Sequence, residues 1–177
     1  MRTAIDRFLR YLDVERNSSA LTIKSYREDL EMLCYFLSYE DGSLPAPGDV
    51  TSQDLRQYVA AMSEAQYARS SISRRLATLR SFYRFCQRQG YTDKNPAKPL
   101  RNPRKQRSLP HFLSTEEVAK LISSPDTDTP MGKRDQAIFE TIYSAGLRVS
   151  ELVGINDGDL HLDEGLIRVR GKGRKER

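Results

Sequence analysis

The spacing of hydrophobic residues over the first 90 positions predicts four helices, because apolar side chains recur there every three or four residues. The expected helices cover about residues 3–16, 21–38, 51–62 and 70–90. Thr3 is the expected N-cap of the first, and Thr51 with Asp54 forms a capping pair that opens the third. Gly90 ends the fourth, since glycine readily adopts the left-handed conformation of a helix C-terminus.

A second group of elements is expected after residue 110. Ser114 and Glu117 have the spacing of a capping box and open a short helix. A longer helix follows over residues 132–145 and ends at Gly146, and a short one is expected over 149–153. The longer helix is expected to bury Ala137, Ile138, Phe139 and Ile142.

The last part of the chain has the pattern of a single strand. Residues 166–170 alternate apolar and basic side chains, as a half-buried strand does. Four acidic residues precede this strand: Asp157, Asp159, Asp163 and Glu164. Their spacing does not match that of an EF-hand calcium loop, so they are expected to form turns. Residues 171–173, Gly-Lys-Gly, form an expected hairpin tip, and no return strand is expected after it.

Positive charge is concentrated in one block. The chain has 29 Lys and Arg against 24 Asp and Glu, a formal charge of +5. Residues 69–107 hold twelve bases and one acid, so this block carries +11 and the rest of the chain −6. Such clustering favours a polyanionic partner, because phosphate binding releases condensed counterions. A solvated helix face with a soluble linker is the alternative reading.

The fourth helix combines a core face with a basic row. Its apolar residues share one side: Ile72, Leu76, Leu79, Tyr83 and Cys86. Arg80, Arg84 and Arg88 recur at every fourth position beside that face, where they can meet DNA phosphates or base edges.

Residues 94–110 are basic and contain four of the eight prolines, which predicts an extended linker. The expected organisation is therefore a helical domain at 1–93, the linker at 94–110 and a second unit at 111–177.

Two positions after residue 145 have candidate chemistry. Arg148 begins a helix, where a cation is disfavoured unless it holds an anion with the exposed amides, and Glu151 lies where it can hold the guanidinium. Lys172 lies between two glycines and can donate a proton to a leaving oxygen. Taken alone, an ordinary surface Arg–Glu pair and an ordinary turn lysine remain the commoner explanations.

The sequence lacks the signals of several other classes of protein. No apolar run reaches the length of a membrane span, and the N-terminus is not a secretory signal, so a soluble, cytoplasmic protein is expected. Cys34, Cys86, His111 and His161 are too few and too scattered for a disulfide framework or zinc site. Nucleotide-binding glycine motifs are absent. We therefore expect no metal, cofactor or small-molecule substrate.

Residues 146–152, Gly-Leu-Arg-Val-Ser-Glu-Leu, followed by Gly-Lys-Gly, resemble the tyrosine site-specific recombinases, and within them the Xer recombinases of chromosome dimer resolution. The stretch 134–177 is similar to the start of their catalytic domain. The first 107 residues, including Asn-Pro-Ala at 95–97, are similar to their core-binding domain. The resemblance implies a mainly α fold: a four-helix, SAM-like core-binding domain, then the start of an α+β catalytic domain cut within its β-hairpin.

The resemblance also implies roles for single residues. Arg148 would contact the scissile phosphate, Lys172 would act as general acid toward the departing 5′ oxygen, and Glu151 would support them. The family's tyrosine forms a 3′-phosphotyrosyl link without metal or nucleotide. The expected partners are double-stranded DNA and related recombinase subunits, as a tetramer on DNA. The expected DNA-binding residues are Arg69, Arg74, Arg80, Arg84, Arg88, Arg104, Lys105 and Arg107.

One departure from the family changes the expectation for this chain. The family's His-x-x-Arg pair, its further His or Trp and its nucleophilic tyrosine have no counterpart here, and Tyr143, in a helix expected to be buried, is in the wrong place. We expect the N-terminal portion of a recombinase, which binds DNA but does not cleave it alone. The alternatives are a non-catalytic, sequence-selective DNA-binding protein and a helical module for an acidic partner.

Overall fold

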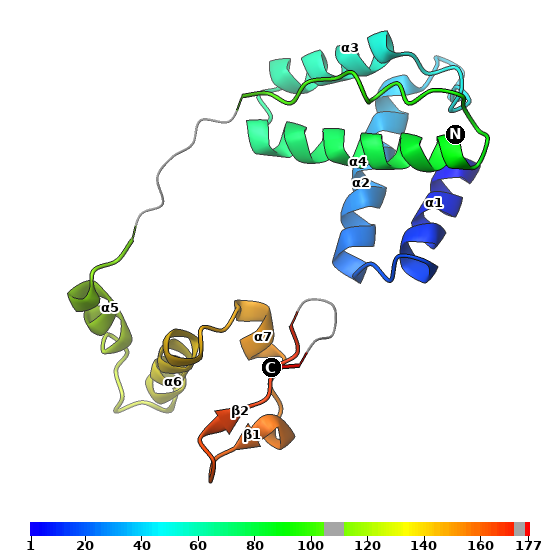
Figure 1. Cartoon of the computed structure of the whole chain (residues 1–177). Helices are drawn as coiled ribbons and strands as arrows, with labels where there is room; N and C mark the ends of the chain where they lie inside the picture. Colours follow the sequence, from blue (N-terminus) through cyan, green and yellow to red (C-terminus); the bar gives the residue numbers. More distant parts are fainter. Residues whose placement is uncertain (105–111, 172–175) are drawn as a thin grey trace. The chain divides into compact units, whose positions relative to one another are not determined.

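Both expected groups of helices are present in the computed structural model, which describes residues 1–104, 112–171 and 176–177 (Figure 1). The chain divides into two compact units, Met1–Arg107 and Ser108–Arg177. None of the helices in the described ranges has the length and apolarity that crossing a bilayer requires.

The N-terminal unit contains the four predicted helices: α1 (Arg2–Val14), α2 (Ala20–Leu37), α3 (Ser52–Glu64) and α4 (Arg69–Arg88). The capping box of Thr51 and Asp54 is confirmed, with N···O distances of 2.8 and 3.2 Å. The prediction that Thr3 caps α1 is wrong. Met1 is the N-cap, because its carbonyl already accepts from the amides of Ala4 and Ile5.

The core of this unit lies where α4 crosses α1 and α2 (Figure 1). The predicted core face of α4 is confirmed, and Phe82 and Phe85 extend it. Phe8 of α1 packs against both, with ring centroids 5.6 and 5.4 Å apart. Burial of these large side chains, each on the order of 2 kcal/mol, accounts for much of the stability of the unit.

The segment after α4 packs on the unit rather than leaving it. Residues 95–104 run back along α4 (Figure 1), where the Arg80 guanidinium donates to the Leu100 carbonyl at 2.6 Å and Asn95 donates to the Arg80 carbonyl at 3.1 Å. Ala97 and Leu100 are buried in the core. A linker that extends from residue 94 is therefore not observed, because these apolar side chains and carbonyls have partners on α4.

The second unit contains α5 (Thr115–Ile122), α6 (Pro130–Ala145), α7 (Val149–Val153), a 3-10 turn (Asp157–Asp159) and the antiparallel strands β1 (Leu160–His161) and β2 (Leu166–Ile167). The capping box of Ser114 and Glu117 is confirmed. Helix α6 begins two residues before the predicted start, because Thr129 caps it and Pro130 fits the first turn.

Two predictions about this unit are corrected. The expected strand over 166–170 is shorter, and a return segment is present, because Val169 and Arg177 exchange two backbone hydrogen bonds of 2.9 and 3.0 Å. The expected burial of α6 is also wrong. Ala137 and Tyr143 are exposed, since α6 packs against α5 and α7 and its remaining surface is uncovered within the described residues. The other three residues expected to be buried are half-buried: Ile138, Phe139 and Ile142.

Candidate active-site arginine and nucleic-acid interface

A tight turn between α6 and α7 places Arg148 at a helix start. Gly146 ends α6 with a φ of +58°, a left-handed conformation that favours glycine. Its neighbour Leu147 donates its amide to the Ile142 carbonyl and is buried, which anchors the turn. Arg148 then takes the extended N-cap position of α7.

A buried carboxylate fixes this arginine. Glu151 accepts the Arg148 backbone amide at 2.9 Å and one guanidinium nitrogen at 2.7 Å. The Glu151 side chain is 3% exposed and that of Arg148 is 68% exposed. The pairing expected from the three-residue spacing is therefore confirmed. One edge of the guanidinium is held by the protein, and much of the side chain remains open to a ligand.

Sequence reasoning missed a second arginine at the same carboxylate. Arg177 donates to the other Glu151 oxygen at 2.8 Å and to the Gly146 carbonyl at 3.2 Å. Two guanidinium groups thus share one carboxylate, and the cluster carries a net positive charge that suits an anion. Arg177 lies 26 residues from Glu151, so no local spacing signals the contact.

The contacts at Glu151 keep it ionised. The hydrogen bond from the Arg148 backbone amide lowers the pKa of the Glu151 carboxyl most, and the guanidinium groups of Arg148 and Arg177 lower it further. The carboxylate is therefore charged at neutral pH and can orient Arg148.

This lowered pKa predicts a pH dependence of the second unit. A carboxyl with a lower pKa in the folded state stabilises that state above its unfolded pKa of about 4.3, and this contribution is lost as the pH falls through the folded value. The protection factors of the α7 amides, which compare observed exchange with intrinsic exchange at the same pH, should therefore fall below about pH 4. Glu151→Gln should weaken this pH dependence. Part of the dependence should remain in the variant, because a hydrogen bond from the Asn156 backbone amide also lowers the pKa of the Asp159 carboxyl. An unchanged pH profile in Glu151→Gln would contradict the assignment.

Three predicted site residues, Lys172, Lys105 and Arg107, lie outside the described residues. The residues on either side of the stretch that contains Lys172 are described and paired, with a bridge between Arg170 and Glu176. Among the described residues, no three His, Cys, Asp or Glu side chains cluster as metal ligands would.

Several candidate DNA-binding arginines have partners inside the N-terminal unit. Arg74 donates to the carboxylate of Asp29, which is 2% exposed. The same carboxylate pairs with Arg75 at 3.4 Å and accepts from Thr78 at 2.8 Å. This buried cluster joins α2 to α4. Arg74 therefore has a packing role, although its side chain is still 49% exposed.

The remaining candidate arginines differ in how many contacts their side chains make within the unit. Arg80 is bound to Leu100 and Asn102, and Arg69 donates to the Arg104 carbonyl at 3.2 Å. The Arg88 guanidinium lies over the ring of Tyr11, 4.9 Å from its centroid. Arg84 is exposed and forms no side-chain hydrogen bond or ion pair within the described part of the chain.

Sequence comparison decides the family. The pattern of the phage integrase N-terminal SAM-like domain matches residues 5–90, and that of the phage integrase family matches residues 111–177. The chain belongs to the phage integrase family. The predicted resemblance to the Xer type of tyrosine recombinase is confirmed by relatives from two bacteria. Tyrosine recombinase XerC of Oceanobacillus iheyensis is 44% identical over 173 residues, and XerD of Listeria innocua is 42% identical over 179.

These relatives are longer than the chain. The alignment covers 98% of this chain but 56% of the XerC protein, and 100% of this chain but 59% of the XerD protein. The chain thus spans less than two thirds of the integrase-family proteins that it matches.

Solved integrases share the fold. A lambda integrase dimer bound to a COC' core site has a TM-score of 0.74 and 17% identity, and the match covers 100% of this chain and 60% of that one. The Tn1549 transposon integrase, in complex with circular intermediate DNA, has a TM-score of 0.67 and 19% identity, with coverages of 98% and 57%. The predicted fold class, a SAM-like helical domain followed by part of the catalytic domain, is confirmed.

Proposed function

We propose that this chain supplies the DNA-binding unit and part of the active site of an Xer-type site-specific recombinase that resolves chromosome dimers. Residues 1–93, with residues 95–104 packed on α4, would bind the duplex, and 111–177 would form part of the catalytic domain. The partners would be double-stranded DNA and further recombinase subunits in a tetramer. The similar lambda and Tn1549 integrases, whose structures hold DNA, support this proposal.

One observation carries the catalytic part: an exposed guanidinium at a helix start, fixed by a buried carboxylate. The free donors of Arg148 would bind the non-bridging oxygens of a DNA phosphodiester. In the family's transesterification a tyrosine attacks the phosphorus and the 5′ oxygen departs. Positive charge at this place stabilises the additional negative charge of the pentavalent transition state. Lys172 would protonate the departing oxygen, and neither metal nor nucleotide would be required.

The DNA-binding part is tested with the chain as it is. Selection from a pool of randomised duplexes should enrich a common motif. The affinity for that motif should fall steeply with salt, with a log–log slope of about −4.5 to −6.3 if five to seven phosphates are contacted. A slope near zero would contradict binding through backbone phosphates. Binding of an acidic protein that competitor DNA leaves unchanged would instead favour the protein-interaction alternative. Absence of any enriched motif would contradict sequence-selective binding.

The catalytic part is tested by covalent trapping. These 177 residues contain no His-x-x-Arg pair, so the chain alone should form no phosphotyrosyl adduct with a nicked substrate that traps cleavage. Denaturing electrophoresis of labelled DNA measures this. A covalent complex formed by the chain alone would contradict the proposal, and its loss in Tyr143→Phe would then identify an unexpected nucleophile.

A further inference from the structure

Arg177 connects three parts of the second unit around one carboxylate. Its backbone exchanges hydrogen bonds of 2.9 and 3.0 Å with Val169, which is buried just after β2. Its guanidinium donates to the Glu151 carboxylate of α7 at 2.8 Å and to the carbonyl of Gly146, which ends α6, at 3.2 Å. These side-chain contacts reach 26 and 31 residues back along the chain. Arg177 therefore fixes the turn between α6 and α7 from outside that turn.

The orientation of the Glu151 carboxylate depends on this contact. Its Oε1 accepts from the Arg148 guanidinium at 2.7 Å, and its Oε2 accepts both from the Arg148 backbone amide at 2.9 Å and from Arg177. The side chain is 3% exposed, so water cannot easily replace a lost donor. Without Arg177 the carboxylate would have partners on Arg148 alone and could turn with that residue.

A buried carboxylate in the N-terminal unit shows what a packing cluster looks like. Asp29 also pairs with two arginines, but one of them, Arg75, is 13% exposed and packs inward. At Glu151 both arginine side chains are more than half exposed, 68% for Arg148 and 51% for Arg177. The cluster at Glu151 is therefore buried at its carboxylate and open at its guanidinium groups, as a site that presents a cation to a ligand should be.

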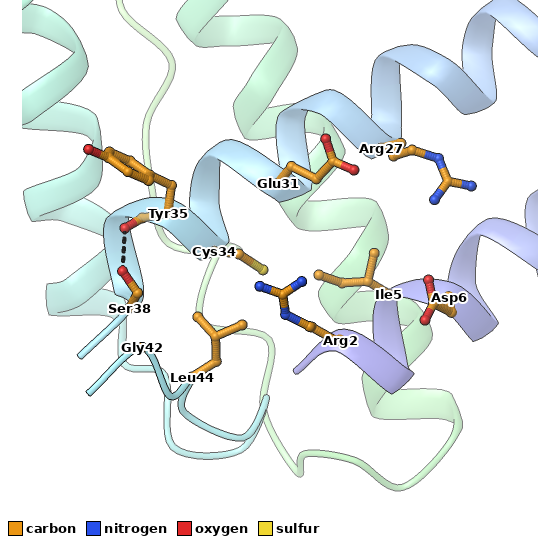
Figure 2. Close-up of a pocket in the computed structure, with 10 residues that line it drawn as sticks. All are labelled: Arg2, Ile5, Asp6, Arg27, Glu31, Cys34, Tyr35, Ser38, Gly42 and Leu44. Carbon is orange, nitrogen blue, oxygen red and sulfur yellow. Dashed lines mark hydrogen bonds between the residues drawn. The ribbon is translucent and has the colours of Figure 1, made fainter. Parts of the chain in front are cut away.

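Opposite charges that lie near each other in this protein do not always pair. Figure 2 shows two arginines and two acids around a cavity of about 550 Å³ in the N-terminal unit: Arg2, Arg27, Asp6 and Glu31. Each arginine lies four residues before an acid on its own helix, a spacing at which side chains can meet. Within the described residues, none of the four takes part in an ion pair. Proximity alone thus does not explain the double pairing of Glu151.

We propose that Arg177 is a positioning residue, which holds Glu151 in the orientation that presents the Arg148 guanidinium to the scissile phosphate. This inference rests on the proposed function and adds to it a residue that acts through Glu151. Arg177 has a second effect, because its charge compensates the carboxylate. The positive charge of Arg148 is then not cancelled by Glu151 and remains available to the phosphate.

Single-turnover cleavage by a recombinase of full family length that carries these residues tests this role. At saturating DNA, Arg177→Ala should lower the rate about tenfold to a hundredfold, because a misplaced catalytic group costs this much. Affinity for the duplex should stay within about threefold, because the other phosphate contacts remain. Adding Arg177→Ala to Arg148→Ala should lower the rate no further, because Arg177 acts only through Arg148.

The matched control is Arg168→Ala. Arg168 is an exposed arginine next to β2, and its side chain forms no hydrogen bond or ion pair within the described part of the chain. Its replacement should change the cleavage rate less than about twofold.

A methylphosphonate at the scissile position separates positioning from folding. It removes the negative charge that the Arg148 guanidinium would neutralise, so the position of that group matters less. On this substrate Arg177→Ala should be less than about threefold slower than the wild type. A variant that merely unfolds the second unit would lose cleavage of both substrates alike.

The same set of variants distinguishes this inference from the proposed function. If Arg148→Ala is defective while Arg177→Ala matches Arg168→Ala, the role of Arg177 is overturned and the proposed function stands. Equal loss by Arg177→Ala on both substrates, or a loss that adds to that of Arg148→Ala, also overturns the role of Arg177. Cleavage by Arg148→Ala at the wild-type rate overturns the catalytic part of the proposed function and this inference with it.

Discussion

Replacing Arg148 by alanine should lower DNA cleavage by at least about a hundredfold to a thousandfold in a recombinase of full family length that carries these residues. The reason is the position of the guanidinium, which Glu151 holds at a helix start while much of it stays exposed. Removing a preorganised donor affects the transition state more than the bound duplex. Affinity for DNA should therefore stay within about threefold, because many other phosphate contacts remain. Trapped covalent complex and electrophoretic mobility measure the two quantities.

A lysine at this position should not restore the rate. An ammonium keeps the charge but cannot hold the carboxylate and a phosphate through one planar fork. Arg134→Ala is the matched control, because Arg134 is an exposed arginine of the same unit that pairs with Asp135 on its own helix. Cleavage by Arg148→Ala at the wild-type rate, with Arg134→Ala also active, would show that Arg148 is an ordinary surface residue.

Replacing Asp29 by alanine should destabilise the N-terminal unit by about 3 kcal/mol, the lower end of the cost of breaking a buried ion pair. The loss leaves Arg75, whose side chain is 13% exposed, without its carboxylate partner. It leaves the Thr78 hydroxyl with only its longer hydrogen bond to the Arg74 carbonyl, 3.4 Å. The Arg74 guanidinium can be hydrated once the carboxylate is gone, because its side chain is half exposed, and this hydration limits the loss of stability. Amide exchange of α4 in the intact chain measures this free energy and separates it from opening of the second unit.

The neighbouring residue provides the control. Glu28 is on the same helix, and its ion pair with Lys24 is exposed and 3.9 Å long. Glu28→Ala also removes a carboxylate from α2 and should shift stability by less than about 0.5 kcal/mol. If Asp29→Ala is no more destabilising than Glu28→Ala, the cluster contributes little to the fold. Asp29→Asn should fall between the two, because it keeps one acceptor but loses the charge.

The structure divides the basic residues of α4 into two groups by their contacts. From the sequence, Arg80 and Arg84 are equivalent members of one row, and both are expected to meet DNA. In the fold the Arg80 guanidinium donates to the Leu100 carbonyl, whereas the Arg84 side chain is exposed. We therefore expect Arg84 to contribute more to phosphate binding and Arg80 to hold residues 95–104 on the helix.

Local features of the chain were determined by the sequence. Helix starts follow from side-chain caps such as Thr51 and Ser114, and the pairing of Arg148 with Glu151 follows from a three-residue spacing, because such hydrogen bonds join residues within one turn. The family was also readable from residues 146–152 with the Gly-Lys-Gly that follows. Strands as short as Leu160–His161 leave too few positions for a period of two to be seen.

Contacts between distant segments were decided only by the tertiary structure. Asp29 meets Arg74 and Thr78 across 45 and 49 residues, and Glu151 meets Arg177 across 26. The crossing of α2 and α4 and the backbone pairing near Val169 bring these groups together. Periodicity shows which face of a helix is apolar, but not which helix covers it. The partners of a charge far along the chain depend on that choice, so which arginines stay free for DNA depends on packing.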